Sequence, residues 1–227
     1  NSPRLKFISQ TRFIRFRHTA EEACRAVETL SRGGIGNISI DLMYGLPGQT
    51  LESFARSIDE ALCLPVQHIS SYALSVEPGT PLAARLQSGF FVEASDEQML
   101  AMYTLLRERL TAAGYEHYEI SNWALPGREA VHNSAYWSRV PYVGLGPGAH
   151  SLGADGMSRS WNNESLDGWT SEGEELDTDE VREERIMLGL RTSRGIPASL
   201  VGGEVVGASG KGYMILVGVM KGDTEEQ

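Results

Sequence analysis

Residues 38–50 read ISIDLMYGLPGQT, and this stretch decides the class of fold that the sequence predicts. Its first five positions alternate apolar with polar side chains, which is the period-two pattern of a strand. The strand runs into Tyr44-Gly-Leu-Pro-Gly48, where glycine and proline favour a tight turn. Behind Thr50, apolar side chains recur at helical spacing over 54–62, so a strand, a turn and a helix follow one another directly.

The flanking segments extend this pattern in both directions. Upstream, Thr19 and Glu22 have the spacing of a capping box and open a predicted helix over 19–32. Downstream, a second strand is expected at His68 to Val76, about 30 residues after the first strand begins, which fits a βαβ unit. A further helix and a third strand, at roughly Glu116 to Asn122, follow. Strands that alternate with helices in this way predict a mostly parallel sheet covered by helices, that is, an α/β fold.

Three loops of this predicted fold are where chemistry is expected. Sheets of this kind bind their ligands beyond the carboxyl ends of the strands. Those ends lead into 43–50, 76–94 and 123–137. The opposite edge of the sheet is expected to be structural.

Composition narrows the classes of function. A chain of 227 residues with 41% hydrophobic content can bury the core of one domain and a small appendage. The net charge of -10 argues against nucleic acid as a partner, because phosphate backbones attract clustered Lys and Arg. We find neither a run of about 18 apolar residues nor the apolar segment of a signal peptide, so a cytoplasmic location is expected.

Several motifs along the chain resemble one family when they are taken together. The segment DLMYGLPGQT is joined, in order, by five others: Val76–Pro81, Gly114–Trp123, the HNSAYW of His132–Trp137, Gly144–Ser151 and Glu184–Thr192. Together they resemble the radical-SAM family of HemW-type haem chaperones and oxygen-independent coproporphyrinogen III oxidases. The HNSAYW segment is similar to the HNxxYW motif associated with HemW. The resemblance covers about residues 17–197.

The resemblance implies an architecture for each part of the chain. Residues 1–170 are expected to form a partial radical-SAM (β/α) barrel with mostly parallel strands. Residues 171–180 are rich in Glu and Asp, which favours a solvated linker into a helix near Val181 to Leu190. Residues 181–227 are then expected to be a truncated C-terminal region, with a short helical stub and weak periodicity beyond Pro197.

The cluster-binding motif CxxxCxxC of the family has no counterpart in this sequence. In the family, its three thiolates hold a [4Fe–4S] cluster and leave one iron free for S-adenosylmethionine. Cys24 and Cys63 are far apart and supply only two thiolates, so this chain alone is not expected to bind the cluster. The chain is therefore expected to begin partway round the family's barrel, and whether it is an enzyme stays open.

Three residues are expected near S-adenosylmethionine on the strength of the resemblance. Asp41 ends the first strand, where its carboxylate can accept hydrogen bonds from ligand hydroxyls or an amine; the alternative is an aspartate that caps the turn. Gln10 and Arg17 can be laid against a cofactor-contacting glutamine and an arginine of the family, with a gap in the alignment. The alternative for Arg17 is a solvated basic patch with Arg12 and Arg15.

The residues expected to bind haem lie in the HNSAYW segment. A neutral imidazole at His132 can ligate haem iron, and Tyr136 and Trp137 offer flat apolar surface for a porphyrin face. The alternative is a histidine that packs and hydrogen-bonds beside aromatic residues. The resemblance favours the haem ligand.

The resemblance implies a function in porphyrin metabolism, and the HNxxYW match favours the chaperone over the oxidase. One alternative is a non-enzymatic porphyrin-binding module that uses His132 and its aromatic neighbours. Another is an inactive gene fragment that self-associates through an exposed sheet edge. Haem or porphyrin is the expected ligand, and a membrane-associated protein is the candidate acceptor of haem.

Overall fold

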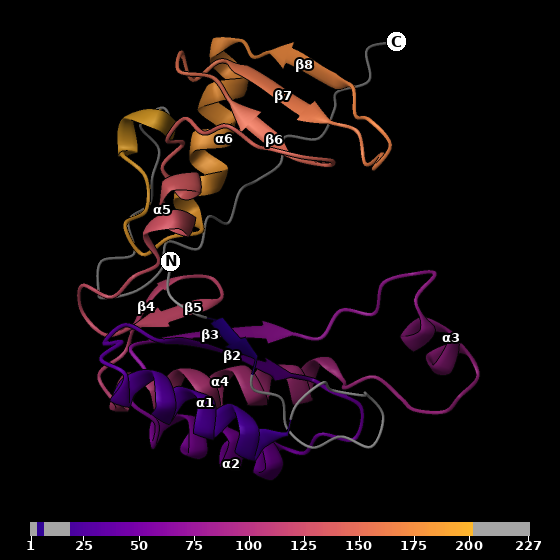
Figure 1. Ribbon diagram of the computed structural model, residues 1–227, viewed down its shortest axis with the longest axis vertical. Coiled ribbons are helices and arrows are strands. Elements are labelled where there is room, and N and C mark those ends of the chain that lie inside the picture. The colour runs from indigo at the N-terminus through magenta and orange to yellow at the C-terminus, as the bar shows by residue number, and fades with distance from the viewer. Residues whose placement is uncertain (1–3, 7–18, 202–227) are drawn as a thin grey trace, which may run out of the picture. The chain divides into compact units, whose positions relative to one another are not determined.

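The computed structural model describes residues 4–6 and 19–201 (Figure 1). By its backbone contacts the chain divides into two compact units, 1–131 and 132–227. The described residues give the first unit a five-stranded sheet and the second unit a three-stranded sheet, each accompanied by helices. The mixed α/β class expected from the sequence is confirmed.

The sheet of the first unit has the strand order β1-β2-β3-β5-β4. These strands are β1 (Arg4–Lys6), β2 (Ser39–Tyr44), β3 (His68–Ala73), β4 (Glu116–Glu119) and β5 (Asn122–Ala124). Strands β1, β2 and β3 are parallel, as the βαβ interval predicts, whereas β5 is antiparallel to both β3 and β4. The described strands thus form a parallel region with an antiparallel hairpin at one edge, and closure into a barrel stays a prediction.

The described helices of the first unit are α1 (Ala20–Arg32), α2 (Leu51–Leu62), α3 (Pro81–Gln87) and α4 (Asp96–Ala112). Helices α1, α2 and α4 were expected from the sequence, whereas α3 lies within 76–94, which was expected to be a loop. Capping boxes open three of them, at Thr19, Thr50 and Ser95, where the side chain accepts a hydrogen bond from the third helical N–H. Because these caps satisfy N–H groups that the helix itself leaves unpaired, they fix the helix starts locally.

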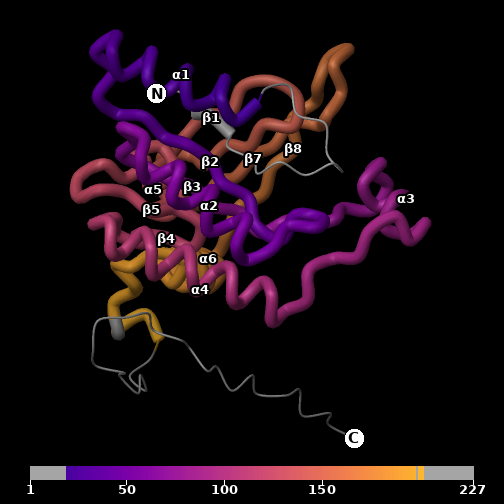
Figure 2. Tube along the Cα trace, turned by 90° about the horizontal axis from the view of Figure 1, so that it is seen from below, coloured from indigo at the N-terminus to yellow at the C-terminus, as the bar shows by residue number. Residues whose placement is uncertain are grey.

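Helices α1, α2 and α4 cover one face of this sheet (Figures 1 and 2). Ile40, Ile69 and Trp123 are adjacent in register across β2, β3 and β5, and all three are fully buried. They share one hydrophobic core with Phe54 of α2 and Leu106 of α4. Burial of this apolar surface is the main force that holds the sheet to its helices.

The third strand differs from the expectation. The sequence predicts one strand over 116–122, but the structure has the two strands β4 and β5 joined by a turn at 120–121. The register shifts between His117 and Glu119, and Ile120 is 48% exposed, so the apolar alternation stops there. The N–H of Ser121 donates to Glu119 Oε1 at 3.1 Å, which closes the turn. A side-chain hydrogen bond over two residues therefore reverses the chain where alternation alone predicts continuation.

The second unit combines an antiparallel sheet with two helices. Its described elements are α5 (Val131–Trp137), β6 (His150–Leu152), β7 (Ser158–Asn162), β8 (Ser171–Glu175), α6 (Thr178–Leu190) and the short 3-10 helix Ala198–Val201. Strand β7 pairs with β6 on one side and with β8 on the other. The first unit ends at Val131, which is the first residue of helix α5, so the remaining residues of this helix belong to the second unit. The predicted helix near Val181 to Leu190 is thus present and starts slightly earlier.

Strand β8 lies in the segment that the sequence predicts as an acidic linker. All five of its residues are exposed, so no apolar alternation marks it as a strand. It pairs with β7 through the backbone, and the carboxylate of Glu174 accepts a hydrogen bond from Arg159 Nε at 2.9 Å. Glutamates on an edge strand also discourage pairing with other chains. Long-range pairing, rather than local propensity, makes this segment a strand.

None of the helices in 4–6 and 19–201 is both long enough and apolar enough to span a bilayer.

Candidate functional site

A row of polar side chains crosses one face of the sheet in the first unit. Asp41 on β2 is the register partner of Ser70 on β3, and Ser70 is the partner of Asn122 on β5. Asn122 in turn pairs with Glu119 on β4. All four residues are at most 5% exposed. The neighbouring rows belong to the core, and successive side chains alternate between faces, so this row points away from the helices.

The chemistry of this row suits a ligand with hydroxyl or amine groups. Oγ of Ser70 and Oδ1 of Asn122 are buried and have no hydrogen-bond partner among the described residues. Nδ2 of Asn122 donates to the carboxylate of Glu119. Buried polar atoms are normally paired, because an unpaired one costs about 1–3 kcal/mol. A polar row of this kind fits the ribose hydroxyls or the amine of a nucleoside ligand such as S-adenosylmethionine.

The turn behind Asp41 is closed by its own residues. The N–H of Leu46 donates to Gln49 Oε1 at 3.1 Å. Gly45 has φ 73°, and a Cβ there would lie 2.3 Å from Met99 Sδ. Backbone conformation and packing therefore explain this glycine without a ligand. Gln49 was not singled out from the sequence, although a glutamine behind Gly-Leu-Pro-Gly is well placed to close such a turn.

A buried hydrogen-bonded chain joins three strands of the first unit. Ser39 Oγ lies 2.7 Å from His68 Nδ1, and His68 Nε2 lies 2.7 Å from the Tyr118 hydroxyl. The N–H of Ala130 also donates to that hydroxyl, at 3.1 Å. The chain is satisfied at both ring nitrogens, which favours a structural role for His68. It ties the segment just before helix α5 to the sheet.

Other residues named from the sequence are not brought into a site. Gln10 and Arg17 lie outside the described residues. Cys24 is half-buried and Cys63 is exposed, and both are free thiols. Within 4–6 and 19–201, no three His, Cys, Asp or Glu side chains gather as a metal site. Because the sequence holds two cysteines in all, the residues present do not fit a [4Fe–4S] cluster held by three thiolates.

In the second unit, helix α5 brings His132 and Tyr136 together. Their ring centroids are 4.8 Å apart and their planes are at 80°, an edge-to-face contact between residues four apart on a helix. Both side chains are exposed. The imidazole is therefore open to a ligand, with an aromatic ring beside it.

Trp137 lies on a different side of helix α5. It is turned about 140° from His132, since each residue advances an α-helix by about 100°. The guanidinium of Arg191, which caps α6, lies 4.7 Å from the centroid of the indole ring. One face of Trp137 is thereby covered, so this side chain packs α5 against the end of α6. The structure does not bring it to the His132–Tyr136 pair.

Helix α5 is followed by an arginine in the left-handed conformation. Arg139 has φ 52°, and among the described residues it alone has a positive φ without being glycine. Its side chain is 6% exposed, forms a 2.7 Å ion pair with Glu184 of α6 and donates to the carbonyl of Gly156 at 3.0 Å. Glycine would adopt this φ without strain. Arg139 therefore occupies the position for its side-chain contacts, which the sequence does not reveal.

Comparison with solved structures defines the fold. No family model matches the chain. The structure of coproporphyrinogen III oxidase HemN from Escherichia coli, a radical SAM enzyme, matches with a TM-score of 0.64 at 22% identity. The match covers 83% of this chain and 49% of HemN. The two proteins therefore share a fold over this part of their chains.

Curated relatives define the family more narrowly. The heme chaperone HemW of Mycobacterium tuberculosis strain H37Rv is 37% identical over 195 residues, which are 82% of this chain and 50% of the relative. HemW of Bacillus subtilis is 38% identical over 189 residues, 79% of this chain and 49% of the relative. The mitochondrial radical S-adenosyl methionine domain-containing protein 1 of Bos taurus is 35% identical over 195 residues, which are 79% of this chain and 44% of the relative.

The chain belongs to the HemW/HemN family of radical-SAM proteins. It spans about half the length of the curated relatives that it matches. The resemblance recognised in the sequence motifs is thus confirmed at the level of the family.

Proposed function

We propose that this chain binds haem through His132 and serves as part of a haem chaperone rather than an oxidase. The observation that carries the proposal is the exposed His132–Tyr136 pair on helix α5. An imidazole nitrogen is a common axial ligand of haem iron, and an aromatic ring beside it can pack against a porphyrin. The curated relatives at 37% and 38% identity carry the name heme chaperone, which supports the same function.

Two residues at and just after the end of helix α5 hold the helix in place. Trp137 is packed under Arg191, and Arg139 is paired with Glu184. Both contacts anchor the carboxyl end of α5 to helix α6. The proposed iron ligand therefore sits on a helix of seven residues that tertiary contacts keep folded, since a helix this short is unstable alone.

A chaperone must also release its cargo. The exposure of His132 suits a site from which haem can be passed to another protein, because an exposed ligand is accessible to a competing one. A membrane-associated acceptor protein is the partner that this function calls for.

Haem titration tests the proposal directly. Haem added to the purified chain is expected to give a stoichiometric shift of its Soret band, and His132→Ala is expected to abolish the shift. His150→Ala is the matched control, because His150 is also an exposed histidine of the second unit. Equal binding by wild type and His132→Ala would contradict the proposal, as would the absence of binding.

A second candidate function is the binding of S-adenosylmethionine on the polar row of the first sheet. The buried Asp41, Ser70 and Asn122 favour it. These side chains would exchange hydrogen bonds with the ribose hydroxyls or the amine of the cofactor. In this family the bound cofactor supplies radical chemistry together with a [4Fe–4S] cluster.

Two neighbouring serines provide a matched test of the second candidate. Ser70 and Ser71 are both buried, and the hydroxyl of neither has a hydrogen-bond partner in the described part of the chain, but they lie on opposite faces of β3. Calorimetry with S-adenosylmethionine is expected to show weaker binding by Ser70→Ala and unchanged binding by Ser71→Ala. Haem binding without any binding of S-adenosylmethionine would favour a non-enzymatic haem-binding module instead.

A further inference from the structure

The aromatic surface around His132 continues beyond helix α5. Tyr136 contacts His132 with one edge, and the ring of Tyr142 packs against Tyr136 with centroids 4.7 Å apart and planes at 86°. Two backbone hydrogen bonds to Leu152, of 3.1 Å and 3.0 Å, fix Tyr142 beside strand β6. His132, Tyr136 and Tyr142 therefore form one unbroken row of rings, which we call the aromatic row.

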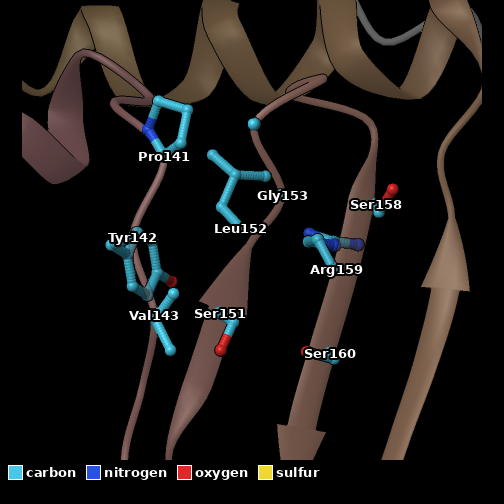
Figure 3. A pocket seen from close by; sticks show the side chains of 10 residues that line it. Pro141, Tyr142, Val143, Ser151, Leu152, Gly153, Ser158, Arg159 and Ser160 are labelled. Carbon is cyan, nitrogen blue, oxygen red and sulfur yellow. The ribbon is translucent and has the colours of Figure 1, made fainter.

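The far end of the aromatic row opens onto a groove. The groove has a volume of about 440 Å³, and Tyr142 forms part of its wall. Figure 3 shows its three segments side by side, namely 141–143, 151–153 and 158–160. The volume lies within the range of about 300–1,000 Å³ that small-molecule sites occupy. Since Tyr142 belongs both to the groove and to the aromatic row, a flat ligand that touches the row can also enter the groove.

The charge at the groove decides which part of such a ligand enters. Arg159 is its one charged lining residue. Its guanidinium donates two hydrogen bonds to Glu174 Oε1, from Nε at 2.9 Å and from Nη2 at 2.6 Å. A third, from Nη1, reaches Glu184 Oε1 at 3.3 Å. Glu184 is shared with Arg139, so two guanidinium groups and two carboxylates balance one another, and Arg159 is not available to an additional carboxylate. The phenol of Tyr142 is neutral as well, because burial raises its pKa above the usual 10.0. The groove therefore suits an apolar edge and disfavours an anionic one.

We propose that Tyr142 and this groove bind the apolar edge of the porphyrin, while the propionate edge points to solvent. The inference rests on the proposed haem function and adds a second binding element and an orientation. The vinyl and methyl edge of haem matches a wall built of Tyr142, Val143 and Leu152. The two propionates remain hydrated, since burying an unpaired carboxylate is costly. Haem is thereby held at two places, the iron at His132 and the apolar edge at the groove.

Variants of the groove separate this inference from the proposed function. Tyr142→Ser is expected to weaken haem binding by about tenfold, whereas Tyr142→Phe keeps the ring and is expected to bind nearly as wild type. Ser160→Leu fills the groove from strand β7 and is expected to weaken binding similarly, which covers the case in which Tyr142→Ser fails to fold. Trp169→Ser is the control, because Trp169 is an exposed aromatic residue of the same unit outside the groove.

Porphyrins with altered edges test the orientation. Iron mesoporphyrin, with ethyl groups in place of vinyls, is expected to bind the wild type as haem does. Iron haematoporphyrin, with hydroxyethyl groups there, is expected to bind about tenfold more weakly, and Ser160→Leu is expected to remove that difference. One outcome would overturn the groove proposal and retain the haem site. In that outcome His132→Ala abolishes binding, Tyr142→Ser and Ser160→Leu bind haem as tightly as the wild type does, and the wild type binds both altered porphyrins as tightly as haem. If no iron porphyrin binds, the haem site and the groove proposal are both overturned.

Discussion

The two units of the chain are stabilised in different ways. The first unit has a core in which fifteen buried residues from the sheet and helices pack together, Phe54 and Leu106 among them. In the second unit, the buried apolar side chains among the described residues are Leu152 and Leu176. Ion pairs take a larger share there, since Glu184 binds both Arg139 and Arg159. The first unit therefore depends on the hydrophobic effect and the second on charged and aromatic contacts.

The difference also separates two kinds of candidate site. In the first unit, polar atoms such as Ser70 Oγ and Asn122 Oδ1 are buried on a sheet face, where they cost stability unless a ligand satisfies them. In the second unit, apolar groups such as Tyr136 and Val143 are exposed, where a flat apolar ligand would cover them. Polar groups are usually exposed and apolar groups are usually buried. Each unit thus has the reverse arrangement at the place where we propose a ligand.

The largest effect is expected from a cavity in the core of the first unit. Leu106→Ala should lower the free energy of unfolding by about 2–5 kcal/mol, because Leu106 is fully buried between α4 and the sheet. Leu100→Ala is the matched control, since Leu100 lies on the same helix and is 66% exposed. Urea unfolding followed by circular dichroism measures both. Similar losses for the two variants would contradict the assignment of the core.

A smaller effect is expected from the ion pair of the second unit. Glu184→Ala should cost about 3 kcal/mol, because it leaves the buried guanidinium of Arg139 without its carboxylate. Arg139→Gly should cost less, since glycine relieves the positive φ while the partly exposed Glu184 keeps Arg159. Thermal unfolding of the two variants measures which of them is less stable. An Arg139→Gly variant less stable than Glu184→Ala would show that the ion pair is not the dominant contact.

The smallest effects are expected from pH, in a different window for each unit. Burial lowers the pKa of His117 below its usual 6.5, so the unfolded chain takes up a proton more readily. Stability of the first unit is therefore full above pH 6.5 and falls as the pH drops below it. His117→Gln should reduce this loss of stability between pH 7 and pH 5, which unfolding curves measure across that range. An unchanged loss in the variant would contradict the contribution of His117.

The second unit has its own titrating group in the turn after β6. Hydrogen bonds from the Ser158 hydroxyl and from the N–H groups of Ser158 and Met157 lower the pKa of Asp155 to about 2. These bonds should persist well below the usual 3.8 and be lost as the pH falls through about 2. Amide chemical shifts of 155–158 report this transition, and a midpoint near 3.8 would contradict it.

Local sequence signals predicted much of the first unit. The capping box at Thr19 predicted the start of α1, and alternation predicted β2, because these patterns act within a few residues. The βαβ interval predicted the position of β3. The prediction of a single strand over 116–122 was wrong, because the hydrogen bond from Ser121 to Glu119 reverses the chain between β4 and β5. Strand β8 was expected as a linker, because it depends on pairing with β7, which local propensity does not encode.

The candidate sites were predictable only where a motif carried them. His132 and Tyr136 follow from the HNxxYW resemblance, and Asp41 follows from the DLMYGLPGQT resemblance. Asp41 was expected at the end of the strand, but β2 continues past it to Tyr44, because residues 42–44 also pair with β3. The alignment of Asp41 with Ser70 and Asn122 depends on sheet register, which a single sequence does not fix. Arg139 gave no signal, because a residue that follows a helix in the left-handed conformation is usually glycine.

Hydrogen exchange with and without haem tests the central claim most directly, because it compares the two units in one experiment. Haem should slow amide exchange in helix α5 and in segments 140–143 and 150–160, and should leave strands β2 and β3 unchanged. Protection centred on the polar row of β2 and β3, with none in helix α5, would contradict the assignment of haem to the second unit.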